Sequence, residues 1–242
     1  SPGNGIFRGG ERTIHMGDFS ENSIFNGHNI QYMAMESGGW KSNDYPGSLL
    51  GSIALIRQTF YDAKWYTQAW EIYNKFPKTN KRPEIDDALN NLSESIKNNI
   101  PFCFITNNEQ DLERVIKLKN EFNFDLWIIG SGYEYRNLRL LDDISPFFIL
   151  NPNFPKKPDV TTFSKTLDVN LNQLKHWDQA PFNPYELHNK GVEFAFSSYN
   201  IKPADFKKNI IKIIEYGLDK KIALSALTTI PAKKLGLEEL FG

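Results

Sequence analysis

Polar side chains follow the apolar runs of this sequence, at the positions where buried strands would end. They are Thr106, Asn107, Ser131, Asn151, Tyr199 and Asn200. Because the carboxyl ends of parallel strands carry the chemistry of many α/β proteins, we expect these side chains to form a polar pocket. The set offers hydroxyls, a phenol and amides, which suits the binding of a small molecule. It contains no nucleophile, base and orienting group together.

The histidines and the cysteine do not suggest a metal or nucleophilic site. His15 lies in a strand-like run, His28 in a Gly/Asn turn, and His176 and His188 in predicted helices. No short spacing joins them into a zinc-binding pattern, so a structural role is favoured for each. Cys103 lies within the apolar run "IPFCFI" and is expected to be a buried small hydrophobe.

The stretch Gly130-Ser131-Gly132 lies between a predicted strand and a predicted helix. Backbone amides at such a position can bind an anion. The longer dinucleotide-binding fingerprint is missing, so a tight strand-to-helix turn is the favoured interpretation.

The hydrophobic pattern predicts an α/β protein. Apolar residues spaced by three and four predict a helix from Pro46, in the first turn, to about Phe76. Strands are predicted at 101–106, 125–130, 146–150 and 192–196, with weaker candidates at 12–16 and 29–35. Helices are predicted at 83–97, 108–122, 133–143, 171–179, 184–189, 203–217, 220–227 and 231–235. Buried strands alternating with amphipathic helices indicate a parallel sheet, and we expect one (β/α)8 TIM-barrel-like domain over 1–242, incomplete.

The composition excludes some partners. The formal net charge of the 242 residues is -1, and Lys and Arg are scattered, so neither nucleic acid nor an anionic membrane is an expected partner. No apolar run reaches the roughly 18 residues of a membrane-spanning helix, so no membrane insertion is expected. The chain opens without Met, in turn-forming residues, and we expect it to be a piece of a longer protein whose first strands lie upstream of residue 1.

Four stretches resemble the amidohydrolase superfamily. They are "YPGSLLGSIALIRQTFYDAKWY" (45–66), "KRPEIDDALNNL" (81–92), "HWDQAPFNPYELHNKGVEFAFSS" (176–198) and "GLDKKIALSALTTIPAKKLGL" (217–237). The resemblance spans roughly 5–242 and is greatest to imidazolonepropionase-like members, in particular to the degenerate N-terminal half of a large two-half bacterial amidohydrolase. It implies a metal-dependent TIM barrel, and a periplasmic or secreted location.

The resemblance also implies a divalent metal such as zinc, which activates water. The family's ligands are a His-x-His pair, a Lys or Glu, two single His residues and an Asp. Its Thr-Ser-Asp-Gly motif falls on 197–200, which puts Tyr199 where the Asp is expected. An acidic residue is expected near Ile105 and a His near Ser131, and neither is present; the His-x-His has no counterpart. Because this sequence lacks the family's ligands at these positions, we expect no metal and no cofactor in this segment. We expect a vestigial pocket formed by the six strand-end residues.

Three functions stay open. The first is an amidohydrolase-like domain without metal ligands, acting as the scaffold or interaction half of a larger hydrolase. Its partner would be the remainder of the parent protein or a second copy of the chain. The second is an active metal-dependent hydrolase of C–N bonds whose ligands come from segments absent here. The third is a small-molecule binding module.

Overall fold

The computed structural model describes residues 5–14, 24–36 and 45–241 of the chain. His15 and the end of the predicted strand 12–16 lie outside the described residues. The chain divides into two compact units. Unit 1 comprises Ser1–Phe25, Asn29–Phe104 and Val115–Leu126, and unit 2 comprises Asn26–His28, Ile105–Arg114 and Trp127–Gly242.

The strands form a mixed, mostly parallel sheet, as expected for the α/β class. Its hydrogen-bonded order follows the chain: β1 (Phe7–Ile14), β2 (Ile24–Ala34), β3 (Phe102–Ile105), β4 (Leu126–Ile129), β5 (Phe147–Leu150) and β6 (Phe194–Phe196). β1 and β2 are antiparallel, whereas β4, β5 and β6 are parallel neighbours. Among the described residues the sheet stays open, with β1 and β6 at its edges. The backbone of His28 lies in β2 and not in the predicted turn.

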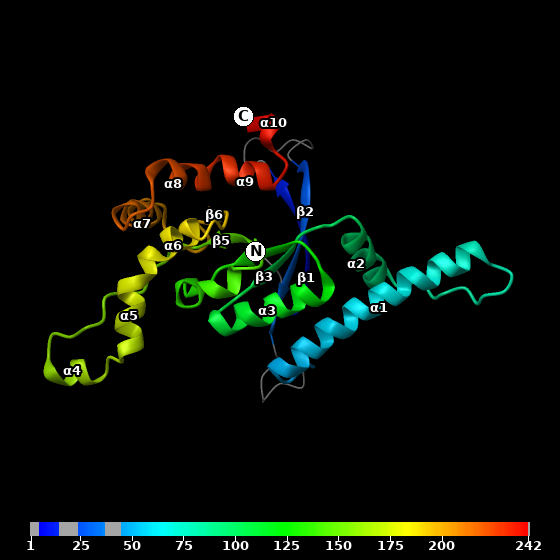
Figure 1. The fold of residues 1–242 in the computed structure, drawn as a ribbon, viewed down its shortest axis with the longest axis horizontal. Coiled ribbons are helices and arrows are strands. Elements are labelled where there is room, and N and C mark those ends of the chain that lie inside the picture. The colour runs from blue at the N-terminus through cyan, green and yellow to red at the C-terminus, as the bar shows by residue number, and fades with distance from the viewer. Residues whose placement is uncertain (1–4, 15–23, 37–44, 242) are drawn as a thin grey trace. The chain divides into compact units, whose positions relative to one another are not determined.

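Unit 1 is organised by the long helix α1 (Leu49–Lys75), against which α2 (Asp87–Lys97) packs (Figure 1). The buried face of α1 carries Ile56, Phe60, Ala63 and Tyr66. The ring of Phe60 lies 4.8 Å from that of Phe122 and 5.2 Å from that of Phe102. Such aromatic contacts add stabilisation beyond the area they bury.

The two helices of unit 1 begin later than their sequences suggest. Pro46 precedes α1, and Ser48 is the N-cap, because its Oγ accepts a hydrogen bond from the N–H of Gly51. Likewise α2 begins at Asp87, because the carboxylate of Asp86 accepts the N–H groups of Ala88 and Leu89. A side-chain cap accepts hydrogen bonds from the N–H groups of the first turn, which have no partner within the helix. A proline in the first turn accepts no such bond and only lacks one of these N–H groups itself.

Unit 2 contains the remaining helices. After the first turns of α3 (Glu109–Phe122) come α4 (Phe163–Leu167), α5 (Leu171–Gln179), α6 (Asn183–Asn189), α7 (Pro203–Glu215), α8 (Lys220–Leu227), α9 (Thr229–Lys234) and α10 (Glu238–Phe241). α8 and α9 pack on β6, and Leu187 of α6 and Ile213 of α7 are fully buried. A short segment, η3 (Ala180–Phe182), joins α5 to α6.

The predicted helix 133–143 does not form. Two 3₁₀ segments, η1 (Glu134–Arg136) and η2 (Leu138–Leu141), take its place. Asn137 separates them with φ -147° and ψ 63°, which no helix accommodates. In the first of these segments, the side chain of Glu134 turns back to the preceding loop.

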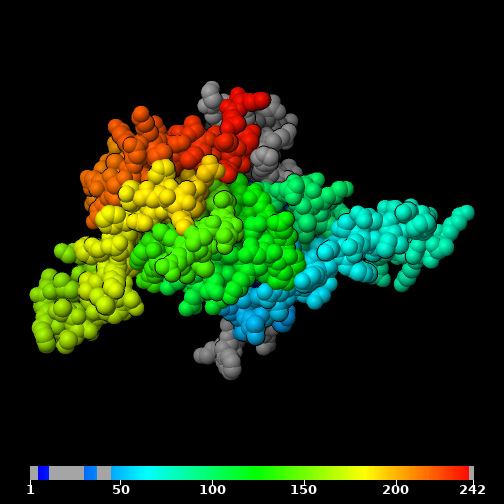
Figure 2. Space-filling view, viewed as in Figure 1, coloured from blue at the N-terminus to red at the C-terminus, as the bar shows by residue number. Residues whose placement is uncertain are grey.

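A further excursion of unit 2 runs from β5 through α4 to α5. Its residues 155–170 project from the remainder of unit 2, as the yellow-green segment of Figure 2 shows. None of the described helices has both the length and the apolar character needed to cross a bilayer.

Candidate functional site

The turn after β4 is built around a buried carboxylate. Glu134 is 1% exposed, and its Oε1 accepts hydrogen bonds from the Ser131 N–H at 2.6 Å and the Ser131 hydroxyl at 2.9 Å. The Gly132 N–H donates to both carboxylate oxygens, and Nδ2 of Asn183 donates to Oε2 at 2.7 Å. The Gly-Ser-Gly turn therefore does bind an anion through its amides, and that anion is its own side chain. We call Ser131, Gly132, Glu134 and Asn183 the rim cluster.

Two glycines are required by this arrangement. Gly132 has a φ of +82°, a conformation that other residues rarely adopt. A Cβ on Gly130 would lie 3.0 Å from Cδ2 of Leu150 and 3.1 Å from Oε1 of Glu134. The sequence therefore places glycines where the turn must be left-handed and where the carboxylate approaches the backbone.

The six strand-end residues do not meet in one pocket. Thr106 is buried, and its hydroxyl donates to the Ile129 carbonyl at 3.0 Å. Nδ2 of Asn151 donates to the Tyr199 carbonyl at 2.8 Å, while the Tyr199 side chain is 56% exposed. Asn200 has a φ of +56° and follows Tyr199 in a turn. The side chains of Thr106 and Asn151 therefore use these hydrogen bonds to hold the backbone in place.

Ser131 and Asn151 line one small cavity, of about 40 Å³, which has room for water. Oδ1 of Asn151 is buried and has no hydrogen-bond partner among the described residues. The structure thus brings Ser131 and Asn151 together at this cavity.

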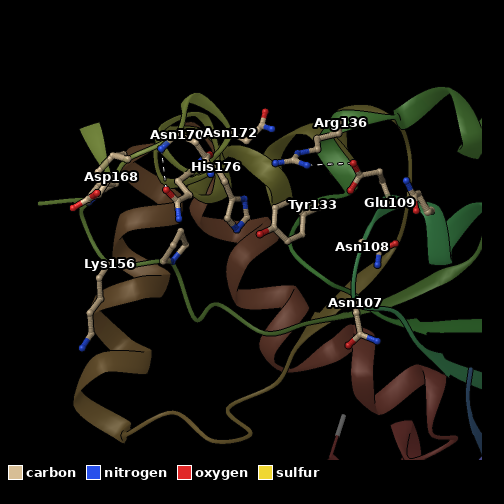
Figure 3. A pocket seen from close by; sticks show the side chains of 15 residues that line it. Asn107, Asn108, Glu109, Tyr133, Arg136, Lys156, Asp168, Asn170, Asn172 and His176 are labelled. Carbon is tan, nitrogen blue, oxygen red and sulfur yellow. Dashed lines mark hydrogen bonds and ion pairs between the residues drawn. The ribbon is translucent and has the colours of Figure 1, made fainter. Parts of the chain in front are cut away.

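A larger cavity, of about 780 Å³, opens beside the rim cluster and belongs wholly to unit 2. Asn107 is the one residue of the six that lines it. Its lining is rich in side-chain amides, namely those of Asn107, Asn108, Gln110, Asn170, Asn172 and Gln173. We call this cavity the amide pocket. It lies after the carboxyl ends of β3 and β4, and the excursion before α5 supplies its other wall (Figure 3).

One wall of the amide pocket is a stack of rings. His176 of α5 lies on Tyr133, with ring centroids 3.8 Å apart, and the Arg136 guanidinium lies 4.4 Å from the Tyr133 centroid. Nδ1 of His176 is 3.3 Å from the Tyr135 hydroxyl. Partial burial, and secondarily the charge of Arg136, lower the pKa of His176 below its ordinary value. The imidazole is therefore neutral at neutral pH.

The charges around the amide pocket balance. Arg136 forms an ion pair with Glu109, with 3.2 Å between Nη1 and Oε1. Lys156 and Asp168 also line the cavity, one charge of each sign. Figure 3 shows both ends of the pocket, with Arg136 beside Glu109 at one end and Lys156 below Asp168 at the other.

The residues present do not fit the metal centre that the resemblance implies. No group of three His, Cys, Asp or Glu side chains that could hold a metal ion occurs in the described parts of the chain. Tyr199, at the position expected for an Asp, is exposed, and Ser131 is hydrogen-bonded to Glu134. Cys103 is buried, as expected.

Comparison with known proteins supports the fold. No family model matches this sequence, and no curated protein does. The chain is similar to the crystal structure of an amidohydrolase from Thermotoga maritima MSB8, with 22% identity and a TM-score of 0.63. The fold is amidohydrolase-like. The similarity covers 86% of this chain and 52% of that chain, so this chain spans about half the length of the structure it matches.

Sequence reasoning missed the residues that organise the site. The sequence pattern places Glu134 inside a helix, gives no role to Asn183 and assigns His176 a packing role only. The one available signal was the closeness of an acidic residue to the Gly-Ser-Gly turn, since an acidic side chain at a turn can accept backbone amides.

Proposed function

We propose that this chain is a partial (β/α)8 domain of the amidohydrolase type that holds no catalytic metal of its own. It serves as the scaffold or interaction half of a larger hydrolase. One observation carries the proposal: the buried carboxylate after the end of β4, Glu134, accepts hydrogen bonds from three residues of the protein itself. A carboxylate held in this way has few lone pairs left for a metal ion.

The share of the solved amidohydrolase that this chain covers supports the proposal that the chain is one half of a larger hydrolase. This chain corresponds to 52% of that chain, so a comparable complete protein would need about as much chain again. The remainder of a longer parent protein, or a second copy of this chain, is the proposed partner.

Metal analysis tests the proposal. The full 242-residue chain is loaded with zinc and, separately, with manganese, desalted, and measured by elemental mass spectrometry beside the complete parent protein. We expect a stoichiometric amount of metal in the parent and well below one equivalent in this chain. Stoichiometric, tight retention of either metal by this chain alone would overturn the proposal and favour an active metal-dependent hydrolase.

A small-molecule binding module is the second candidate function. The amide pocket favours it, because cavities of roughly 300–1,000 Å³ beside strand ends are the usual sites of small ligands. This candidate predicts ligand binding without metal and is compatible with a domain that does not catalyse.

A further inference from the structure

The amide pocket offers both donors and acceptors that the protein does not use. The side chains of Asn107, Gln110 and Asn172 form no hydrogen bond with any other described residue. Asn108 uses only its Oδ1, which accepts the Asp111 N–H. Each amide presents an acceptor oxygen and two N–H donors. A ligand that satisfies them must itself both donate and accept, as a hydroxyl group does.

The remaining amides are held in fixed positions. In the capping box of α5, Oδ1 of Asn170 accepts the Gln173 N–H, and Oε1 of Gln173 accepts the Asn170 N–H. Their NH₂ groups remain available as donors. The stack of His176 on Tyr133 fixes the opposite wall. A pocket that is ordered before binding loses less conformational entropy when a ligand enters.

The charge balance argues against an ionic ligand. Arg136 is paired with Glu109, and an anion drawn to Lys156 would also lie in a pocket that contains the Asp168 carboxylate. A cation would meet the opposite conflict. A hydrocarbon would leave the amides without partners, which costs free energy once water is excluded.

We propose that the amide pocket binds a neutral polyhydroxylated small molecule, of the class of a mono- or disaccharide. This inference rests on the second candidate function, the binding module. The cavity volume of about 780 Å³ accommodates a ligand of this size.

Ligand titration followed by NMR tests the inference on the full chain. The probes are N-acetylglucosamine, maltose, glucose 6-phosphate and benzyl alcohol, each at millimolar concentration. We expect at least one of the two neutral sugars to shift the amide signals of the pocket, and the phosphate to add no affinity. Absence of shifts with both neutral sugars overturns the inference. The inference is also overturned if glucose 6-phosphate or benzyl alcohol binds more tightly than the neutral sugars.

Two variants locate the binding. Asn172→Leu and Gln110→Leu each remove an amide that no described residue requires, and each should weaken sugar binding roughly threefold to tenfold. The matched control is Asn189→Leu, on the exposed end of α6 outside the pocket, which should leave the affinity unchanged. Equal affinities in all three variants would overturn this location.

The metal measurement separates this inference from the first candidate function. A chain that retains metal and also binds sugar contradicts only the proposed lack of a metal centre. A metal-free chain that binds neither sugar contradicts only the inference about the amide pocket.

Discussion

The rim cluster and the amide pocket lie side by side in unit 2 and use their polar groups in opposite ways. In the rim cluster, the Glu134 carboxylate and Asn183 are buried and hydrogen-bonded to each other and to the turn after β4. In the amide pocket, the amides of Asn107 and Asn172 are exposed and bond to no other described residue. Buried polar groups must be satisfied within the protein, whereas exposed ones can exchange water for a ligand. The difference separates the residues that hold the site from those that can recognise a molecule.

The largest effect is expected when the centre of the rim cluster is removed. Glu134→Ala leaves the N–H groups of Ser131 and Gly132 and the amide of Asn183 without an acceptor, so it should lower the free energy of unfolding by roughly 3 to 5 kcal/mol. Urea denaturation of both proteins measures the change. The matched control is Glu71→Ala on the exposed face of α1, which should stay within about 0.5 kcal/mol of wild type. Equal effects at both positions would contradict the comparison.

A smaller effect is expected for the second member of the rim cluster. Asn183→Ala removes the donor to Glu134 Oε2 and the acceptor of the Tyr135 N–H, and should cost roughly 2 kcal/mol. Because the two side chains belong to one network, the double variant with Glu134→Ala should cost about 1 kcal/mol less than the sum of the single changes. A double-mutant cycle in urea gives this coupling, and strict additivity would show that the network is not cooperative.

The ring stack between the two regions should make stability depend on pH. The pKa of His176 is lowered in the folded state, so the unfolded chain binds a proton first, and the contribution of His176 to stability falls as the pH drops through about 6.5. His176→Phe keeps a ring on Tyr133 and cannot titrate, so its stability should decline less over the same range. Denaturation midpoints at a series of pH values compare the wild type with His176→Phe. If the midpoints of both proteins change with pH in the same way, His176 does not cause the pH dependence.

The smallest effect is expected in the amide pocket. Asn172→Leu removes no hydrogen bond to any described residue and should change the free energy of unfolding by less than about 0.5 kcal/mol. Thermal or urea denaturation measures this, with Glu134→Ala as the contrasting variant. A loss comparable to that of Asn183→Ala would mean that the amide has a structural partner, and the distinction between the two regions would fail.

Local sequence patterns predicted most elements of this fold. The predicted helices 171–179 and 220–227 coincide with α5 and α8. The apolar runs around Cys103 and Ile128 contain β3 and β4. These patterns are reliable because the period of buried side chains differs between a helix and a strand and can be counted along the chain. The amidohydrolase-like fold expected from the resemblance is supported by the solved structure from Thermotoga maritima.

The structure differs from the sequence pattern where contacts join distant residues. The helix expected at 133–143 is replaced by two 3₁₀ segments that Asn137 separates. Glu134, in the first segment, bonds to Ser131 and to Asn183, which lies 49 residues further along the chain. The common pocket expected for the strand-end residues is divided, because Thr106 and Asn151 bond to neighbouring backbone carbonyls. Neither pattern is visible in the spacing of residue types.

The sequence by itself determined the α/β class, the order of the elements and the polar character of the strand ends, because burial periodicity and turn residues act locally. Only the tertiary structure decided which polar groups are closed off in the rim cluster and which remain available in the amide pocket. The physical reason is that a hydrogen bond between distant segments satisfies a polar group without leaving a local signal. The chemistry available to a ligand is therefore what remains after the fold has satisfied its own buried groups.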